Sequence, residues 1–297
     1  MAVGLRPGFV HYATFPDVRT PEQLVDAIAL VLDNGFKVVE LSSMLGPALL
    51  ERAAQVIRER AATLFLSAGP EFVRTRRSLC DVRVDARVAT VRRVWELIDL
   101  AAALGAENLM LVSGADPGPD QRATARAALV DSMQRIAEYG RARPAPRITL
   151  ETFARERPPA QLLGPTAETL ALLDAVGAAE LGVTIDLSHL VQLGEDVGPA
   201  AASLAPRSTH VHLSTCVLAS GHPLDGDQHP SFNEPGIALS LDAAALAIRG
   251  LALGDGVVSV EIRRHHGEAA GAFVRECARY WRTAVGEHLR TVERTPQ

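Results

Sequence analysis

The sequence lacks the features of several specialised protein classes. Three cysteines are spread over 297 residues, so a disulfide framework is not expected and a reducing compartment is favoured. No apolar run reaches the ~18 residues of a membrane span, and the opening residues MAVGLRPGF have no signal-peptide core. We therefore expect a cytoplasmic protein with no membrane partner.

Positive charge is also scarce. The 35 acidic residues outnumber the 30 Lys and Arg residues, and the formal net charge is −5. Proteins that bind nucleic acids usually present a basic face, so no nucleic-acid partner is expected. Hydrophobic residues make up 47% of the chain. That fraction excludes a disordered protein, and a chain of this length can bury a sizeable core.

Short apolar runs alternate with longer stretches of helical periodicity. Runs of this kind are typical of strands that are buried on both faces. The eight predicted strands are Phe9–Ala13, Phe36–Leu41, Thr63–Ser67, Asn108–Ser113, Arg147–Thr152, Leu181–Leu187, Thr209–Ser214 and Val257–Ile262. The clearest predicted helices are Pro21–Asn34, Asp85–Leu104, Pro165–Val176, Leu239–Leu253 and Glu268–Leu289. Several of these helices stop at a glycine, and Thr20 is a suitable N-cap for the first.

Strict alternation of strands and helices predicts a parallel sheet, and eight units fit a (β/α)₈ TIM barrel. The competing fold is a doubly wound sheet, which would lead us to expect a glycine-rich phosphate loop after the first strand. The chain has no G-x-G-x-x-G and no G-x-x-x-x-G-K-[ST] motif. No stretch resembles a linker, so residues 1–297 are expected to form a single TIM-barrel domain.

Four consecutive predicted strands end in side chains that can ligate a metal. These are Glu151, Asp186, His212 and Glu261. Each alone has an ordinary structural explanation, as a salt-bridge partner, a loop cap or a packed histidine. Functional side chains of TIM barrels come from the C-terminal strand ends, so all four should meet there. Carboxylates buried together are costly without a cation. A divalent metal ion is therefore expected, and Mn, Mg, Co, Zn and Fe all suit these ligands.

Several segments then resemble the xylose-isomerase-like TIM-barrel superfamily, which includes sugar phosphate isomerases and epimerases, inosose-processing enzymes and the endonuclease IV group. They are Asn34–Ser42, Ala103–Gly114, Ile148–Phe153, Leu181–Asp196, His210–Ser214 and Ser259–Ile262. The resemblance implies that the four strand-end residues are the family's shared metal ligands. It places His189 on the D-x-x-H histidine, which contacts substrate in the epimerases and binds a further metal in the endonuclease group.

The chain departs from both groups. Endonucleases carry extra histidines after strands three and four, where this chain has Ser67–Pro70 and Val112–Gly114. Epimerases tend to carry an arginine soon after the strand-seven histidine, but Leu213–Asn233 contains none. Asp227 and His229 resemble the endonuclease D-x-H pair. A second metal at His189, Asp227 and His229 is therefore an alternative to a polar loop turned by Asp225–Gly226.

Other polar residues are weaker candidates. His222 shares the loop after strand seven, His265 and His266 follow strand eight, and His11 lies near the start of the barrel. Arg155 and Arg157 follow Glu151 and are candidates to hold an anionic substrate group, although a solvated loop explains them as well.

Three functions remain open. The first is an isomerase, epimerase or related dehydratase of a small sugar, polyol or similar hydroxy-carbonyl substrate. In that case Glu151 and Glu261 exchange protons with the substrate, which His189 contacts, and the metal stabilises an enediolate. The second is a multinuclear hydrolase of a small phosphoester or amide, or a multi-iron oxidative enzyme, using the second metal site. The third is a non-catalytic barrel, against which the complete ligand set argues. The sequence leaves open whether the chain forms homo-oligomers.

Overall fold

A computed structural model describes residues 4–265 and 267–292. Eight parallel strands close into a barrel, in which β1 pairs with both β2 and β8. The strands are β1 (Arg6–Val10), β2 (Val38–Ser42), β3 (Thr63–Ser67), β4 (Asn108–Leu111), β5 (Arg147–Glu151), β6 (Leu181–Asp186), β7 (Ser208–Leu213) and β8 (Val257–Val260). The predicted (β/α)₈ barrel is confirmed.

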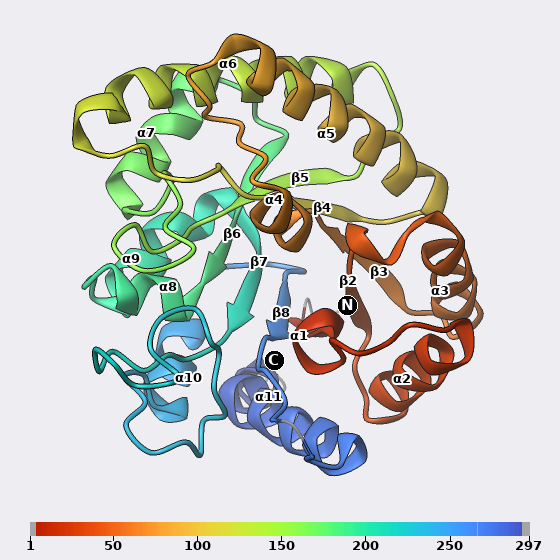
Figure 1. The fold of residues 1–297 in the computed structure, drawn as a ribbon. Coiled ribbons are helices and arrows are strands. Elements are labelled where there is room, and N and C mark those ends of the chain that lie inside the picture. Colours follow the sequence, from red (N-terminus) through yellow and green to blue (C-terminus); the bar gives the residue numbers. More distant parts are fainter. Residues whose placement is uncertain (1–3, 266, 293–297) are drawn as a thin grey trace.

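The helices are α1 (His11–Thr14), α2 (Pro21–Asp33), α3 (Pro47–Glu59), α4 (Gly69–Thr75), α5 (Val84–Leu104), α6 (Arg122–Arg141), α7 (Thr166–Val176), α8 (Leu187–Gln192), α9 (Val197–Leu204), α10 (Leu241–Arg249) and α11 (Ala270–Val292). The longer helices surround the strands as an outer ring, and the short helices α1 and α4 lie over the centre of the barrel (Figure 1). No helix within the described ranges is long and apolar enough to cross a membrane.

Local signals set the ends of the helices. The Thr20 side chain accepts a hydrogen bond from the backbone of Gln23 while the Gln23 side chain caps Thr20, so α2 begins with a reciprocal capping box. Helices α5 and α7 end at Gly105 and Gly177, which adopt left-handed φ values of 72° and 69°. Glycine carries no Cβ and adopts this conformation without strain.

The predicted boundaries differ most from the structure at two places. The first strand is Arg6–Val10 rather than Phe9–Ala13, and the chain turns into the short helix α1 at His11. The predicted helix Leu239–Leu253 is shortened to α10, because Ser240 caps Ala243 and starts the helix there. Apolar content alone does not separate a buried strand from a buried helical turn.

Side-chain alternation divides each strand between the barrel interior and the surrounding helices. In β2, Val39 and Leu41 join the large core cluster that includes residues of the helices, whereas Val38 packs in a separate small cluster with Phe65 and Val257. Each buried Val, Leu or Phe side chain contributes roughly 1.5–3 kcal/mol. The interior is crowded: a Cβ on Gly8 would lie 2.3 Å from Ser259 Oγ, so β1 needs glycine there.

Candidate metal centre

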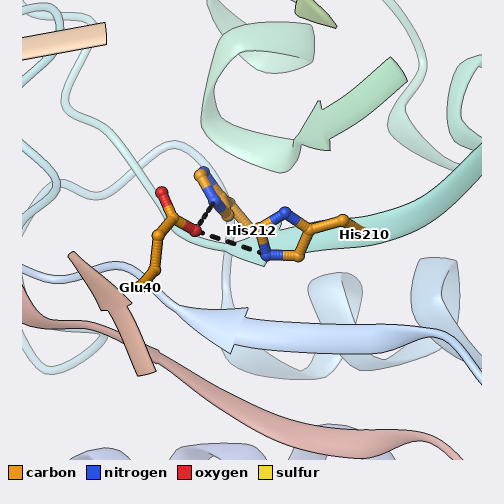
Figure 2. A group of neighbouring side chains, drawn as sticks. All are labelled: Glu40, His210 and His212. Atoms are coloured by element: carbon orange, nitrogen blue, oxygen red, sulfur yellow. Dashed lines mark hydrogen bonds and ion pairs between the residues drawn. The ribbon is translucent and has the colours of Figure 1, made fainter. Parts of the chain in front are cut away.

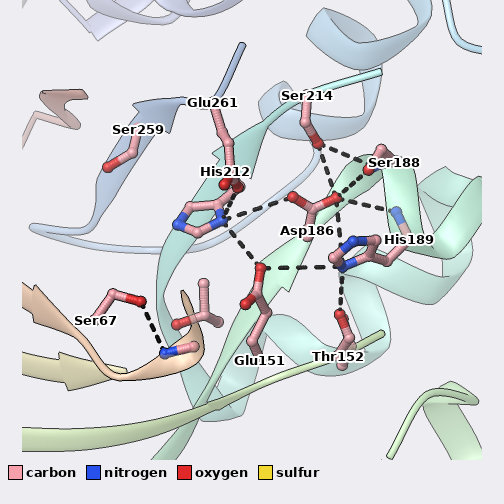
Figure 3. Close-up of polar contacts among 12 residues, drawn as sticks. Ser67, Glu151, Thr152, Asp186, Ser188, His189, His212, Ser214, Ser259 and Glu261 are labelled. Carbon is pink, nitrogen blue, oxygen red and sulfur yellow. Dashed lines mark hydrogen bonds and ion pairs between the residues drawn. The ribbon is translucent and has the colours of Figure 1, made fainter. Parts of the chain in front are cut away.

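The four predicted ligands meet at the C-terminal mouth of the barrel. Glu151 and Asp186 are the last residues of β5 and β6, His212 is the penultimate residue of β7, and Glu261 directly follows β8. The register pairs Asp186 with His212 across β6 and β7. Period-two alternation therefore directs these side chains to the interior, where Figure 3 shows them facing one another.

His212 Nδ1 is the common contact of the three carboxylates. It lies 2.6 Å from Glu261 Oε2, 3.3 Å from Glu151 Oε1 and 3.6 Å from Asp186 Oδ2. One ligand atom from each of the four residues lies within 4.8 Å of every other, and all four residues are buried. The set offers three carboxylates and one imidazole to a single point.

Unpaired polar atoms at this point fit a cation. Asp186 Oδ1 accepts hydrogen bonds from the Ser188 and Ser214 hydroxyls and from the backbone N–H of His189, at 2.7, 2.8 and 3.0 Å. Asp186 Oδ2 is buried and has no hydrogen-bond partner among the described residues, and the 2.6 Å contact of His212 Nδ1 with Glu261 Oε2 lacks hydrogen-bond geometry. Leaving buried acceptors unpaired is costly. A divalent metal ion bound by all of them would remove that cost, so the donor set suits the expected metal.

The electrostatics of the centre are strongly perturbed. Burial raises the pKa of the Glu151 carboxyl to about 7, although His212 opposes the shift. Burial alone would lower the pKa of His212, but Glu261, Glu40 and the other carboxylates outweigh it and hold the pKa well above 6.5. A group that is poised near neutral pH beside several charges is typical of a functional site.

His189, Asp227 and His229 form a second cluster beside the first. Asp227 Oδ1 lies 3.2 Å from His189 Nε2 and 2.6 Å from His229 Nε2. His189 Nδ1 lies 2.7 Å from the Thr152 carbonyl, to which it donates, so Nε2 is the nitrogen presented to Asp227. Asp186, His189 and His229 also place ligand atoms within 4.8 Å of one another. The structure thus brings together all three residues of the predicted second site.

The pKa values within this second cluster are shifted by its opposite charges. Burial would lower the pKa of both imidazoles, but nearby carboxylates raise it to about 10 for His189 and about 9 for His229. The pKa of Asp227 is held well below its ordinary value by His229 and His189, against the effect of burial. His229 has a φ of 43°, a left-handed conformation that is uncommon for a non-glycine residue and is concentrated at functional sites.

A cavity of about 430 Å³ opens above both clusters. Glu151 and Glu261 line it from the first cluster, and Asp227 and His229 line it from the second. Further polar groups on its wall come from Tyr12, Arg74, Arg263 and Arg264, and apolar surface comes from Ala13, Pro16, Pro70, Val73, Met110 and Phe153. The cavity has the size of a small-molecule site.

The weaker candidates lie elsewhere. The guanidinium of Arg155 pairs with Glu168 at 2.6 Å, and Arg157 pairs with Asp225. The His222 ring accepts a backbone hydrogen bond within its own loop, and His265 lies 3.7 Å from Glu234. None of these four residues is among the described residues lining the cavity. His266 lies outside the described residues.

His11 is buried in the fold rather than placed on the cavity wall. Its ring stacks on Phe15 at 5.0 Å, and its Nε2 atom has no hydrogen-bond partner in the described part of the chain. Burial lowers the pKa of His11 to about 4. His11 is therefore a packed histidine in this structure.

This burial makes stability sensitive to acid. The pKa of His11 is lower in the folded chain than the ordinary 6.5, so the unfolded chain takes up the proton first as pH falls. Between pH 7 and pH 5 the folded state should lose about 2 kcal/mol through this group. The His11→Phe variant should lose correspondingly less in urea unfolding at the two pH values. Equal pH dependence in the two proteins would contradict this prediction.

Sequence reasoning missed Glu40. Strand ends alone do not point to Glu40, because it lies mid-strand in β2, where it is fully buried. Its carboxylate lies 3.1 Å from His212 Nε2. Period-two alternation was the available signal, because Val39 and Leu41 face the helices and so direct Glu40 inward.

Comparison with known proteins agrees with this architecture. The family model of the xylose isomerase-like TIM barrel matches residues 28–284. The chain belongs to this family. No curated protein matches the sequence significantly.

Solved structures of similar fold cover almost the whole chain. An L-ribulose 3-epimerase has a TM-score of 0.74 and 19% identity, over 99% of this chain and 100% of that one. D-psicose 3-epimerase from Clostridium cellulolyticum H10 has a TM-score of 0.72 and 14% identity, over 96% and 99%. The IOLI protein, solved with a zinc atom, has a TM-score of 0.76 and 15% identity, over 95% and 99%. At these identities the similarity establishes the xylose isomerase-like fold alone.

Proposed function

We propose that the chain is a divalent-metal-dependent isomerase or epimerase, or a related dehydratase, of a small hydroxy-carbonyl compound such as a sugar or polyol derivative. One observation carries the proposal. Of the four residues at the metal centre, Glu151 and Glu261 line the cavity, whereas Asp186 and His212 are not among its described lining residues. The centre therefore presents two carboxylates to a substrate.

Two carboxylates around one cavity suit proton transfer at carbon. Glu151 enters from β5 and Glu261 from the end of β8, so they approach from separate strands. One removes the proton next to the carbonyl, and the other returns a proton to the same or a neighbouring carbon. The pKa of Glu151, about 7, is near the pH at which a general base works best. A bound divalent cation would supply Lewis-acid stabilisation of the negative charge on the substrate oxygens.

The rest of the cavity suits a polar molecule of modest size. Arg264 is fixed by donating from Nε to the Thr14 carbonyl at 3.1 Å, and Arg74 lines another part of the wall from α4. Their guanidinium groups are donors that can meet hydroxyl or carbonyl oxygens. The structural similarity to the L-ribulose and D-psicose 3-epimerases supports the same substrate class.

Exchange of a carbon-bound hydrogen with solvent tests this function. The metal-loaded chain is incubated in D₂O with ketopentoses, ketohexoses and inososes, and deuterium incorporation is followed by mass spectrometry. Incorporation into at least one compound, abolished by a chelator and restored by metal, is the expected result. Failure of every compound to exchange, together with metal-dependent hydrolysis of a phosphoester or amide, would overturn the proposal.

The second cluster favours one other candidate, a multinuclear hydrolase or multi-iron oxidative enzyme. His189 and His229 both direct Nε2 at Asp227 Oδ1, which is a ligand arrangement for a further metal. Against it stands the geometry, because Asp227 Oδ1 already contacts both imidazoles, whereas Asp186 Oδ2 of the first centre has no hydrogen-bond partner among the described residues. We therefore favour a single metal. His189 is not among the described residues that line the cavity and lies behind Asp227, which does line it.

The Asp227→Asn variant separates the two candidates. With a single metal, it should bind the same number of metal equivalents as the parent chain, since Asp227 is not a ligand of the first centre. The matched control is Asp225→Asn, which alters a carboxylate of the same loop that pairs with Arg157. Elemental analysis gives the stoichiometry. Loss of one equivalent in Asp227→Asn alone would establish the second metal and favour the hydrolase.

A further inference from the structure

Glu40 is a fully buried carboxylate below the metal centre. It lies on β2, across the barrel interior from β7, and Figure 2 shows one of its oxygens directed at both His210 and His212. Glu40 Oε2 lies 3.1 Å from His212 Nε2 and 3.5 Å from His210 Nε2. Glu40 was not one of the ligands expected from the strand ends, and its oxygens are absent from the four-residue ligand group.

The contact with His212 determines which ring nitrogen is free. A carboxylate oxygen accepts hydrogen bonds, so His212 donates its Nε2–H to Glu40. A metal ion at Nδ1 would replace the second proton of the ring, so a metal-bound His212 would keep one proton, on Nε2, and present the Nδ1 lone pair. Nδ1 is the atom that faces Glu151, Asp186 and Glu261. Glu40 thus selects the tautomer that the metal centre requires.

The other oxygen of Glu40 is held from the cavity side. The Tyr12 hydroxyl donates to Glu40 Oε1 at 3.0 Å and lies 3.4 Å from Ser67 Oγ. Burial, reinforced by Glu40, raises the pKa of Tyr12 well above 10, so the hydroxyl stays a donor. Because Tyr12 also lines the cavity, a continuous chain of contacts runs from the cavity wall through Glu40 to His212.

A metal bound directly by Glu40, His210 and His212 is the competing explanation, since their ligand atoms lie within 4.8 Å of one another. The existing contacts account for these groups without a metal. His210 Nε2 lies 2.8 Å from Ser259 Oγ, and each oxygen of Glu40 already has a hydrogen-bond partner. In the four-ligand centre, by contrast, Asp186 Oδ2 has no hydrogen-bond partner among the described residues. The hydrogen-bonded arrangement is therefore favoured.

We propose that Glu40 is the positioning residue of His212: it fixes the tautomer and ring orientation in which Nδ1 binds the metal, and Tyr12 holds Glu40 in place. This inference rests on the proposed metal centre. It adds to that centre a residue that touches neither the metal nor the substrate. Mutation of a residue that hydrogen-bonds a metal-bound histidine in this way typically weakens metal affinity by roughly 10–100-fold.

Metal affinity measured without substrate tests the role of Glu40. Dissociation constants for Zn²⁺ and Mn²⁺ are measured by chelator competition for the full chain, Glu40→Leu and Glu40→Gln. Leucine has no acceptor and should weaken binding roughly 10–100-fold. The glutamine carbonyl can accept from Nε2–H, so Glu40→Gln should recover part of the loss. If the leucine variant does not fold, Glu40→Gln decides, because loss of the charge alone should weaken binding measurably.

Two controls separate positioning from a general loss of structure. Glu71→Leu and Glu71→Gln alter another buried carboxylate, which pairs with Arg93. Glu71 is not among the described residues that line the cavity, so both variants should keep the metal affinity of the parent chain. Nitrogen-15 NMR of the imidazoles provides a second readout. The hydrogen-bonded His212 Nε2–H signal should be present in the metal-loaded parent and Glu40→Gln, and shifted or absent in Glu40→Leu.

The outcomes are distinguishable. Folded Glu40 variants with the parent's metal affinity would overturn the positioning role and leave the metal centre intact. Loss of a whole metal equivalent from a chain that holds two would instead make the Glu40, His210 and His212 group a metal site, and would also overturn it. A parent chain that binds no metal would overturn the proposed function itself.

Discussion

The Asp186→Asn variant should lose tight metal binding while the fold stays intact. Three donors, from Ser188, Ser214 and the His189 backbone, converge on Asp186 Oδ1. In the variant, these three donors favour the amide oxygen of asparagine in the place of Oδ1. The amide NH₂ group then takes the place of Oδ2 and points into the metal centre. Its hydrogens occupy the place of the unpaired Oδ2 and repel a cation. Asparagine remains a good N-cap for α8, so stability should change little.

Mutation of a residue that contacts a ligand without binding the metal weakens affinity by at most roughly 100-fold. Asp186→Asn alters a ligand itself, so its metal affinity should fall by more than this. Chelator competition measures this change, and circular dichroism checks the fold. The matched control is Asp174→Asn, which alters an exposed carboxylate of α7 that pairs with Arg207. Equal affinities in Asp186→Asn and Asp174→Asn would show that the metal binds elsewhere.

The Glu151→Gln and Glu261→Gln variants should each lose catalysis in a different way. Glutamine keeps an oxygen for the metal but neither accepts nor releases a proton, and general acid–base groups contribute typically about 10²–10⁴-fold to rate. If the two glutamates serve opposite directions of an epimerisation, each variant should stop epimer interconversion. Each should still exchange the hydrogen of one epimer, and the two variants should retain different epimers.

Deuterium exchange starting from each pure epimer, at saturating metal, reveals this pattern. Glu195→Gln is the matched control, because Glu195 accepts hydrogen bonds from Thr166 and is not among the described residues that line the cavity. One variant could lose exchange from both epimers while the other variant loses exchange from neither. That result would contradict a two-base mechanism and leave a single catalytic glutamate.

The barrel and the convergence of four candidate ligands were predictable because both follow from periodicity. Buried strands that alternate with capped helices indicate a closed parallel barrel, and parallel strand ends collect at one mouth. Glu151, Asp186, His212 and Glu261 stand at or next to such ends, so their positions in the sequence predict that they lie together. The family model over residues 28–284 confirms the family that was inferred from the same segments.

Other features depend on tertiary contacts that local sequence does not encode. The turn of the chain into α1 at His11 depends on packing, including the hydrogen bond from Thr14 to the Ile262 carbonyl. The loop bearing Asp227 and His229 is long, and only its folding back over α8 brings them to His189. Glu40 was missed because strand ends, rather than the whole inward face of each strand, were searched.

Metal content is the measurement that tests the central claim most directly. The full chain is loaded with Mn²⁺, Co²⁺ or Zn²⁺, freed of loosely bound ions and subjected to elemental analysis. The account predicts about one tightly bound equivalent per chain, held by three carboxylates and one imidazole. A chain that retains no metal from any of these solutions would contradict the metal centre and the proton-transfer mechanism together.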